Sequence, residues 1–207
     1  MEFSDLARAR RSVRSYQPGL TLSDDELRAI FVEVVLSPSS FNLQHWLFVV
    51  VRDPARKQAL RKLAYGQAQV EQSAAVVLVC GRLDAHADAE RIYADDAPAA
   101  RAKYVPMIKA VYQEQPALQR EEAIRSGALA AMSLMYAARN RGWDSGPMIG
   151  FDAAKVAALL ALTANVVPVM LIVLGRARDG VTAARSYRRP LPEVVRLETL
   201  DGMALHA

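Results

Sequence analysis

Three short apolar runs rich in β-branched residues constrain the fold of this chain more than any other feature. They lie at 46–51, 75–80 and 166–175. Runs of this composition are typical of strands buried inside a sheet. Pro168 falls near the start of the third run, where a strand tolerates a missing N–H group. A shorter strand is expected at 143–145, after a helix that Gly142 would end.

Helical patterns separate these predicted strands. Ser23 and Glu26 form a capping box, followed by apolar residues at helical spacing, so a helix is expected to begin there and to stop before Pro38. The segment 84–119 is alanine-rich, charged and broken by prolines, which favours short helices interrupted by turns. Further helices are predicted at about 5–11, 54–63, 70–73, 121–140 and 152–162. We therefore expect one domain over 1–207, an α+β sandwich in which a central mixed sheet carries helices on both faces.

The composition is that of an ordinary globular chain. Its 207 residues are 52% hydrophobic and 23% charged, which is enough for a full core. The formal net charge of +4 suits an anionic ligand as well as nucleic acid, but no zinc-finger spacing or RNA-binding strand motif occurs, so no nucleic-acid partner is expected. No membrane span and no apolar signal core are found, and Cys80 is the single cysteine, so we expect a cytoplasmic protein.

A cluster of arginines near the N-terminus is the first candidate site. Arg10, Arg11, Ser12 and Arg14 bring three guanidinium groups and a hydroxyl within five residues. If the helix continued through them, Arg10 and Arg14 would repel each other on one face, and a bound counter-ion would explain the arrangement. Arginine forms a planar bidentate fork that suits phosphate. The alternative is a solvated basic helix end, which taken alone is the more common case.

Arginines also follow the last predicted strand, where Arg185 and Arg188 lie in a proline-rich and therefore extended segment. They could join the same anion site, or could belong to a basic tail.

Three further segments carry polar groups beside turns. Pro38, Ser39, Ser40 and Asn42 form a loop before the first strand, and hydroxyl and amide groups of this kind suit the edge of a heterocycle. The alternative is a loop that only caps the preceding helix. The other two segments contain Gln67 and Gln69, which could address a flat ring, and Ile149 and Gly150, where backbone N–H groups can approach a ligand closely.

The sequence lacks the residue patterns that metal sites and nucleophilic catalysis require. His45, His86 and His206 show no metal-ligand spacing, and no nucleophile elbow occurs. Cys80 lies within an apolar run and is expected to be an inert buried thiol. Redox chemistry supplied by a cofactor needs none of these groups.

The five segments, in this order, resemble the FMN-dependent nitroreductase family, in its bacterial NAD(P)H nitroreductase type. The resemblance rests on RRSVRSY at 10–16, SPSSFNLQHW at 37–46, YGQAQVEQSA at 65–74, PMIGFD at 147–152 and RSYRRPL at 185–191. It implies an α+β sandwich that forms an interlocked homodimer, with FMN at the subunit interface and NADH or NADPH as reductant.

Site roles also follow from this resemblance. Arg10, Arg11 and Ser12, with Arg188 and either Arg185 or Ser186, would hold the FMN phosphate and ribityl chain. Arg14 would approach the pyrimidine edge of the flavin, Gln67 and Gln69 would contact the ring or ribityl, and the backbone of Ile149 and Gly150 would lie near flavin N5. Pro38, Ser39, Ser40 and Asn42 would reach the flavin of the other subunit.

The implied reaction is a two-step hydride transfer. NAD(P)H would reduce the flavin at N5 and leave, and a nitroaromatic, quinone or similar small acceptor would then occupy the same place. The family also hosts enone reduction and flavin breakdown, and a flavin-binding protein without turnover is a third alternative. The physiological acceptor and the choice between NADH and NADPH cannot be taken from the sequence, because 84–119, the segment that would set them, matches no motif.

Overall fold

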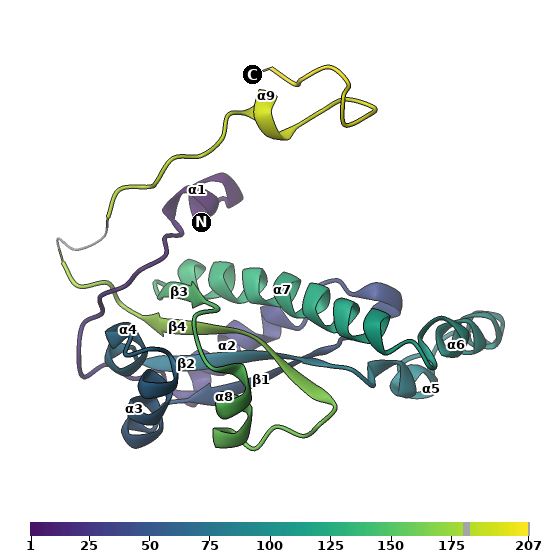
Figure 1. Ribbon diagram of the computed structural model, residues 1–207, viewed down its shortest axis with the longest axis horizontal. Coiled ribbons are helices and arrows are strands. Elements are labelled where there is room, and N and C mark those ends of the chain that lie inside the picture. Colours follow the sequence, from purple (N-terminus) through teal and green to yellow (C-terminus); the bar gives the residue numbers. More distant parts are fainter. Residues whose placement is uncertain (180–182, 207) are drawn as a thin grey trace.

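The computed structural model describes residues 1–179 and 183–206 and is built around one antiparallel sheet. Its strands are β1 (Trp46–Val51), β2 (Ala75–Arg82), β3 (Asp144–Met148) and β4 (Val166–Gly175), in the order β1-β2-β4-β3. The three predicted apolar runs therefore form neighbouring strands, and the expected short strand lies at the edge beside β4. The α+β class is confirmed (Figure 1).

The expectation of a mixed sheet is corrected, because every pair of these strands is antiparallel. The first connection shows why. Helices α3 (Pro54–Leu63) and α4 (Ala68–Gln72) fold back on each other between β1 and β2, so the chain returns to the end where β1 finished, and Val51 pairs with Val76. A parallel pair would need a crossover to the opposite end. Among the described residues, parallel pairing is confined to an isolated bridge between Ser12 and Ser145.

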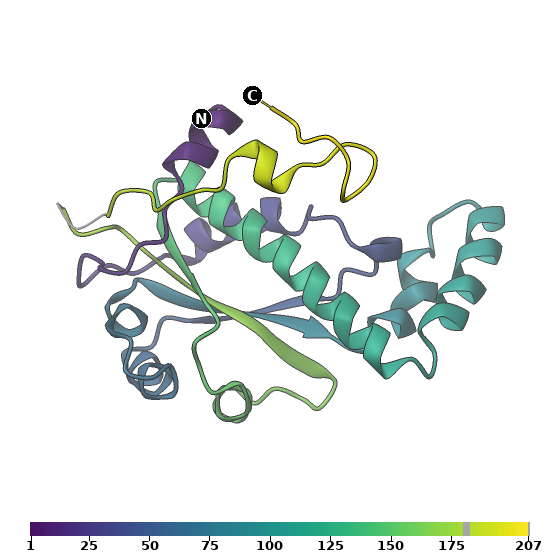
Figure 2. The ribbon, with the colours of Figure 1, turned by 45° about the horizontal axis from the view of Figure 1, so that its top comes forward.

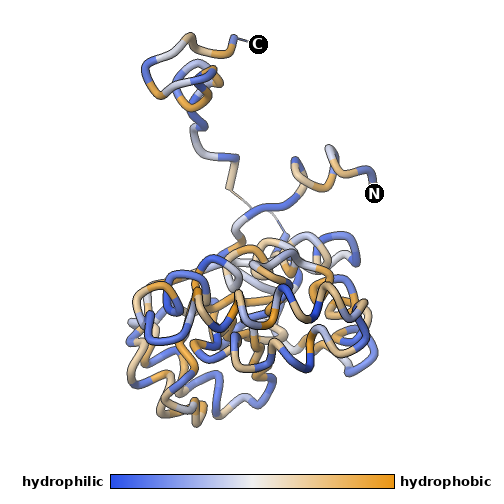
Figure 3. Tube along the Cα trace, turned by 90° about the vertical axis from the view of Figure 1, so that its right-hand side faces the viewer, coloured by the Kyte–Doolittle hydropathy of each residue, from blue (hydrophilic) through white to orange (hydrophobic). Residues whose placement is uncertain are grey.

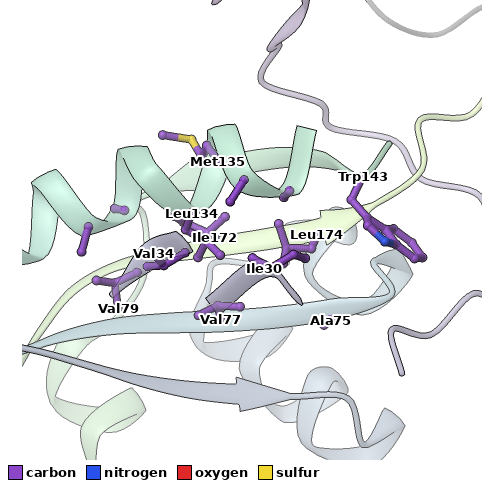
Figure 4. Close-up of a cluster of buried hydrophobic side chains, with 14 of the residues drawn as sticks. Ile30, Val34, Ala75, Val77, Val79, Leu134, Met135, Trp143, Ile172 and Leu174 are labelled. Carbon is purple, nitrogen blue, oxygen red and sulfur yellow. The ribbon is translucent and has the colours of Figure 1, made fainter. Parts of the chain in front are cut away.

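Helices α2 (Asp24–Val34) and α7 (Pro116–Asn140) cover one face of the sheet. Alternate residues of a strand point to opposite faces, so Val77 and Val79 of β2 pack here with residues of β4, α2 and α7. Figure 4 shows this cluster with Leu134 of α7 lying over the strands. The buried side of α7 is mostly alanine, which lets the helix pack closely on the sheet. This long alanine-rich core helix was predicted, but it begins at Pro116 rather than near residue 121.

Helices α3, α4 and α8 (Ala153–Leu159) cover the opposite face. Val76, Leu78 and Cys80 of β2 point this way and pack against Leu60 and Val156. Figure 2 shows α7 on one side of the sheet and these shorter helices on the other, so the prediction of helices on both faces is confirmed.

The predicted helix starts at Ser23, Asp53 and Asp152 are confirmed, because each side chain accepts a hydrogen bond from the backbone three residues on. Smaller boundary differences remain: α4 begins two residues and ends one residue earlier than expected, β3 extends to Met148, and α8 stops at Leu159.

The segment 84–119 forms η2 (Ala85–Asp88), α5 (Ala89–Ile92) and α6 (Pro98–Tyr112) before it enters α7. Short helices separated by turns were predicted here. Pro98 and Pro116 each start a helix, whereas Pro106 lies inside α6. These elements enclose a small apolar cluster of their own, which includes Leu43, Val105 and Ile108. They lie at the end of the sheet away from α4 (Figure 1).

Both chain ends leave the sheet. Helix α1 (Phe3–Ala9) and the C-terminal segment, which contains α9 (Leu191–Val194), lie to one side of it (Figures 1 and 3). The C-terminal segment stands away from the sandwich and exposes large apolar side chains, including Leu200 at 93% and Met203 at 76%. A search of the described residues finds no helix long and apolar enough to cross a bilayer.

Candidate functional site

The arginine cluster lies on extended backbone that follows α1. The helix ends at Ala9, and Arg10 has an extended conformation (φ −62°, ψ 123°). The helix was expected to end near Arg11 and ends two residues earlier, so Arg10 and Arg14 do not share a helix face. Instead the segment runs beside β3, where the Val13 N–H donates to Ser145 O at 2.9 Å. This segment lies so close to β3 that residue 146 has to be a glycine, because a Cβ there would lie 2.5 Å from Val13 O.

The two ends of the chain meet at a cationic pocket of about 430 Å³. Its wall contains no carboxylate among the described residues. It is lined by Arg10, Arg11, Ser12, Val13, Arg14, Ala183, Ala184, Arg185, Ser186 and Arg188. The tertiary structure thus brings together all seven of the arginine and serine residues that sequence analysis offered for an anion site at the two termini, Ser186 included.

Arg10 is a half-buried cation of this pocket. Its Nη1 is buried and has no hydrogen-bond partner among the described residues. Burial, followed by the nearby charges of Arg185, Arg188 and Arg11, lowers the pKa of Arg10. A guanidinium with a buried, unpaired nitrogen close to other positive charges is unfavourable unless an anion accompanies it. The donor set fits a dianion such as a phosphate monoester, which offers several strong acceptors.

Two other arginines of the pocket donate to backbone carbonyls of the chain ends. Arg185 Nη2 donates to the carbonyl oxygens of Ala7, Arg8 and Arg10 at 3.2, 2.8 and 3.1 Å, so it binds the C-terminal end of α1. Arg11 Nη2 donates to Ala183 O at 2.6 Å and joins the two termini. These bonds position Arg10 and hold the pocket wall.

A second pocket of about 290 Å³ opens beside the first and shares Ser12, Val13 and Arg14 with it. Arg14 is the single ionisable side chain in its described lining. The remaining lining residues come from α4, the residue before it, β3 and the turn after β3: Gln67, Gln69, Gly146, Pro147, Met148, Ile149 and Gly150. Amide, hydroxyl and backbone groups on an otherwise apolar wall can bind a flat heterocycle at its edges.

The two glutamines of this pocket have different surroundings. Gln67 Nε2 donates to Ala64 O at 3.1 Å and to Gly150 O at 2.9 Å, and its Oε1 accepts from Gln69 Nε2 at 2.9 Å. Gln67 is therefore engaged in holding the turn at Gly150. The side-chain oxygen of Gln69 accepts no hydrogen bond from the part of the chain that the structure describes. Ile149, in the same turn, is 77% exposed.

The loop with Pro38, Ser39, Ser40 and Asn42 lines neither pocket. It contains the short helix η1 (Ser40–Asn42) and packs beside α5 and α6, at the other end of the sheet (Figure 1). One copy of the chain does not bring this loop together with the remaining candidate residues.

Sequence analysis missed several lining residues, among them Val13, Met148, Ala183 and Ala184. They are small or apolar, and the only signal for them is that they neighbour predicted site residues. The expected inert role of Cys80 is consistent with the structure, because the side chain is buried and burial raises the pKa of its thiol to about 12. Over residues 1–179 and 183–206, no group of acidic, histidine and cysteine side chains could hold a metal ion.

Comparison with known proteins identifies relatives over nearly the whole chain. The model of the nitroreductase family matches residues 7–176. A Bacillus subtilis protein described as "Putative NAD(P)H nitroreductase MhqN" is 36% identical over 201 residues, which cover 94% of this chain and 98% of that protein.

Solved structures agree with this match. The crystal structure of a "putative nitroreductase" from Bacillus subtilis superposes with a TM-score of 0.90 at 35% identity, covering 94% of this chain and 97% of that one. A "putative nitroreductase" from Exiguobacterium sibiricum, solved in complex with FMN, superposes with a TM-score of 0.87 at 31% identity, covering 94% of this chain and 96% of that one.

Proposed function

The chain belongs to the nitroreductase family, and on that basis we propose that it is an FMN-dependent oxidoreductase. It takes electrons from NADH or NADPH and passes them to a nitroaromatic, a quinone or a similar small acceptor. Residues 1–207 act as one FMN-binding domain. We place it in the cytoplasm, because its single cysteine is buried and needs no oxidising compartment.

One observation carries this proposal. A cationic pocket, in which one buried nitrogen of Arg10 has no partner among the described residues, adjoins a second pocket whose described lining is amide, apolar and backbone apart from Arg14, and the two share Ser12 and Arg14. A ligand that fills both must have an anionic end and a flat polar end joined by a short linker. FMN has this form, and a solved relative with the same fold binds it.

The cationic pocket would hold the phosphate. Its hydrogen bonds would come from Arg10, Arg11, Ser12 and Arg188. The bonds from the guanidinium groups would be the strongest, because they are charge-assisted. Arg185 contributes a positive charge nearby but acts mainly by fixing the end of α1, since its Nη2 is bonded to three backbone carbonyls there.

The second pocket would hold the ring. FMN, when bound, supplies the two-electron redox chemistry that links NAD(P)H oxidation to reduction of the acceptor. Arg14 would place a positive charge beside the ring and stabilise negative charge on it. Gln69 would offer a side-chain oxygen that accepts no hydrogen bond within the described chain, and Gln67 would hold the turn so that the backbone N–H groups of Ile149 and Gly150 face the ring.

Two copies of the chain would complete the site. Pro38, Ser39, Ser40 and Asn42 then reach the flavin of the partner subunit, which accounts for their distance from the pockets of their own chain. Exposed apolar side chains support such an assembly: Leu36 after α2 is 79% exposed, and Leu129 of α7 is 48% exposed. The apolar C-terminal segment would pack on the second copy and interlock the homodimer.

The test is direct. The purified protein should be yellow, release FMN on denaturation, and oxidise NADH or NADPH when a nitroaromatic, a quinone or an enone is added. FMN without turnover on any acceptor would identify a flavin-binding protein instead, and turnover on enones alone would move the assignment to enone reduction. Protein that neither retains nor rebinds FMN would refute the proposal.

A further inference from the structure

The loop between α2 and β1 has an unusual backbone. Phe41, Asn42 and Gln44 have φ of 50°, 54° and 49°, in the left-handed region that residues other than glycine seldom adopt. Each such residue is unfavourable and persists only where the surroundings hold it. Hydrogen bonds within the loop supply part of this restraint, since the Gln44 N–H donates to Ser39 Oγ at 2.9 Å.

Two tyrosines from the α5–α6 region supply further restraint on the loop. Tyr112 Oη donates to Ser40 Oγ at 2.9 Å, and Tyr93 Oη donates to Phe41 O at 3.1 Å. Tyr112 is 2% exposed, as expected for a core side chain. Both hydroxyls therefore reach from a buried cluster into the strained part of the loop.

The ring of Tyr112 is also enclosed by this region. Phe41 and His45 approach it edge-on with ring centroids at 6.2 Å, and His86 stacks on it at 6.1 Å. Residues on both sides of the loop and from η2 thus pack on one side chain. The loop, η2, α5 and α6 form a single packed unit at that end of the sheet.

We propose that Tyr93 and Tyr112 are positioning residues for the flavin site of the partner subunit. They hold the loop, with its strained backbone at Phe41, Asn42 and Gln44, in the conformation in which Ser39, Ser40 and Asn42 meet FMN. This inference rests on the proposed function, because it assumes that the loop contacts the cofactor. It gives segment 84–119 a defined role, which is to fix this loop through Tyr93 and Tyr112.

Tyr112→Phe and Tyr93→Phe remove one hydroxyl each and keep the ring. The net value of a neutral hydrogen bond predicts that each raises the Kd for FMN about 2- to 12-fold. Tyr104→Phe is the matched control, since Tyr104 packs on Tyr93 at 5.6 Å and its hydroxyl makes no hydrogen bond within the described chain. It should leave the Kd unchanged.

Amide hydrogen exchange gives a readout that does not depend on FMN. Without FMN, Tyr112→Phe should speed exchange over residues 39–44 and leave β2 and β4 protected. A double-mutant cycle with Ser40→Ala then separates a specific contact from general weakening: once Ser40 Oγ is gone, Tyr112→Phe should raise the Kd no further.

The outcomes are distinct. Wild-type protein that binds no FMN refutes the proposed function and this inference together. Wild-type binding with faster loop exchange but an unchanged Kd in both variants refutes the inference alone, as does unchanged exchange. Equal losses of FMN affinity with and without Ser40 Oγ would show a merely structural effect and would also overturn it.

Discussion

Replacing Arg10 with methionine removes one guanidinium from the cationic pocket while keeping an unbranched, apolar stem. With FMN present, the variant loses a charge-assisted hydrogen bond to the phosphate, worth about 1.5–3 kcal/mol, so the Kd for FMN should rise about 10- to 150-fold. Without FMN, the same substitution should be favourable to the protein. Arg10 Nη1 is then buried without a partner and lies near Arg11, Arg185 and Arg188, so its removal should raise the free energy of unfolding.

Two ligands make the assay specific. Fluorescence titration of the FMN-free protein would give the Kd for FMN and for riboflavin, which has the same ring without the phosphate. Arg10→Met should weaken FMN alone. Arg8→Met is the control, because the Arg8 side chain is 80% exposed and lies outside the pocket. Equal losses for both flavins, or apoprotein that is destabilised by Arg10→Met, would contradict the assignment of Arg10 to the phosphate.

Three further predictions concern the body of the fold. Ser23→Ala removes the capping box of α2, in which Ser23 Oγ accepts from the Glu26 N–H, and should lower the free energy of unfolding by about 1 kcal/mol; unchanged stability in urea would show that the cap is not needed. Cys80 should resist a disulfide thiol reagent at pH 8 and react once in denaturant, because the buried thiol has a pKa of about 12; rapid reaction of the native protein would count against this burial. Burial lowers the pKa of His45 in the folded protein below its usual 6.5. As the pH falls through 6.5, the unfolded chain therefore takes up a proton before the folded protein does. The free energy of unfolding should then fall by at most about 1.4 kcal/mol per pH unit until the pKa of the folded protein is reached. Unfolding measured from pH 7 to 5.5 should lose this slope in His45→Gln, and an unchanged slope would assign it to other groups.

The local parts of the fold could be predicted because short-range chemistry fixes them. The apolar runs that become β1, β2 and β4, and the helix starts at Ser23, Asp53 and Asp152, depend on neighbours a few residues away. Strand direction could not be predicted in this way. It depends on whether the connecting helices carry the chain across the sheet or fold back, as α3 and α4 do.

The same distinction between local and long-range effects applies to the candidate site. The amino-acid sequence shows which groups are available: arginines at both termini, a polar loop before β1, and glutamines and glycine beside turns. How these groups are used depends on contacts that form only when the chain folds. The tertiary structure ended α1 before Arg10, bonded Arg185 to the end of that helix, engaged Gln67 with Gly150 and placed Tyr112 under the strained loop. The physical reason is range: caps and periodicity act between near neighbours along the chain, whereas the burial of Arg10 and its unpaired nitrogen arise from contacts between residues more than 170 positions apart.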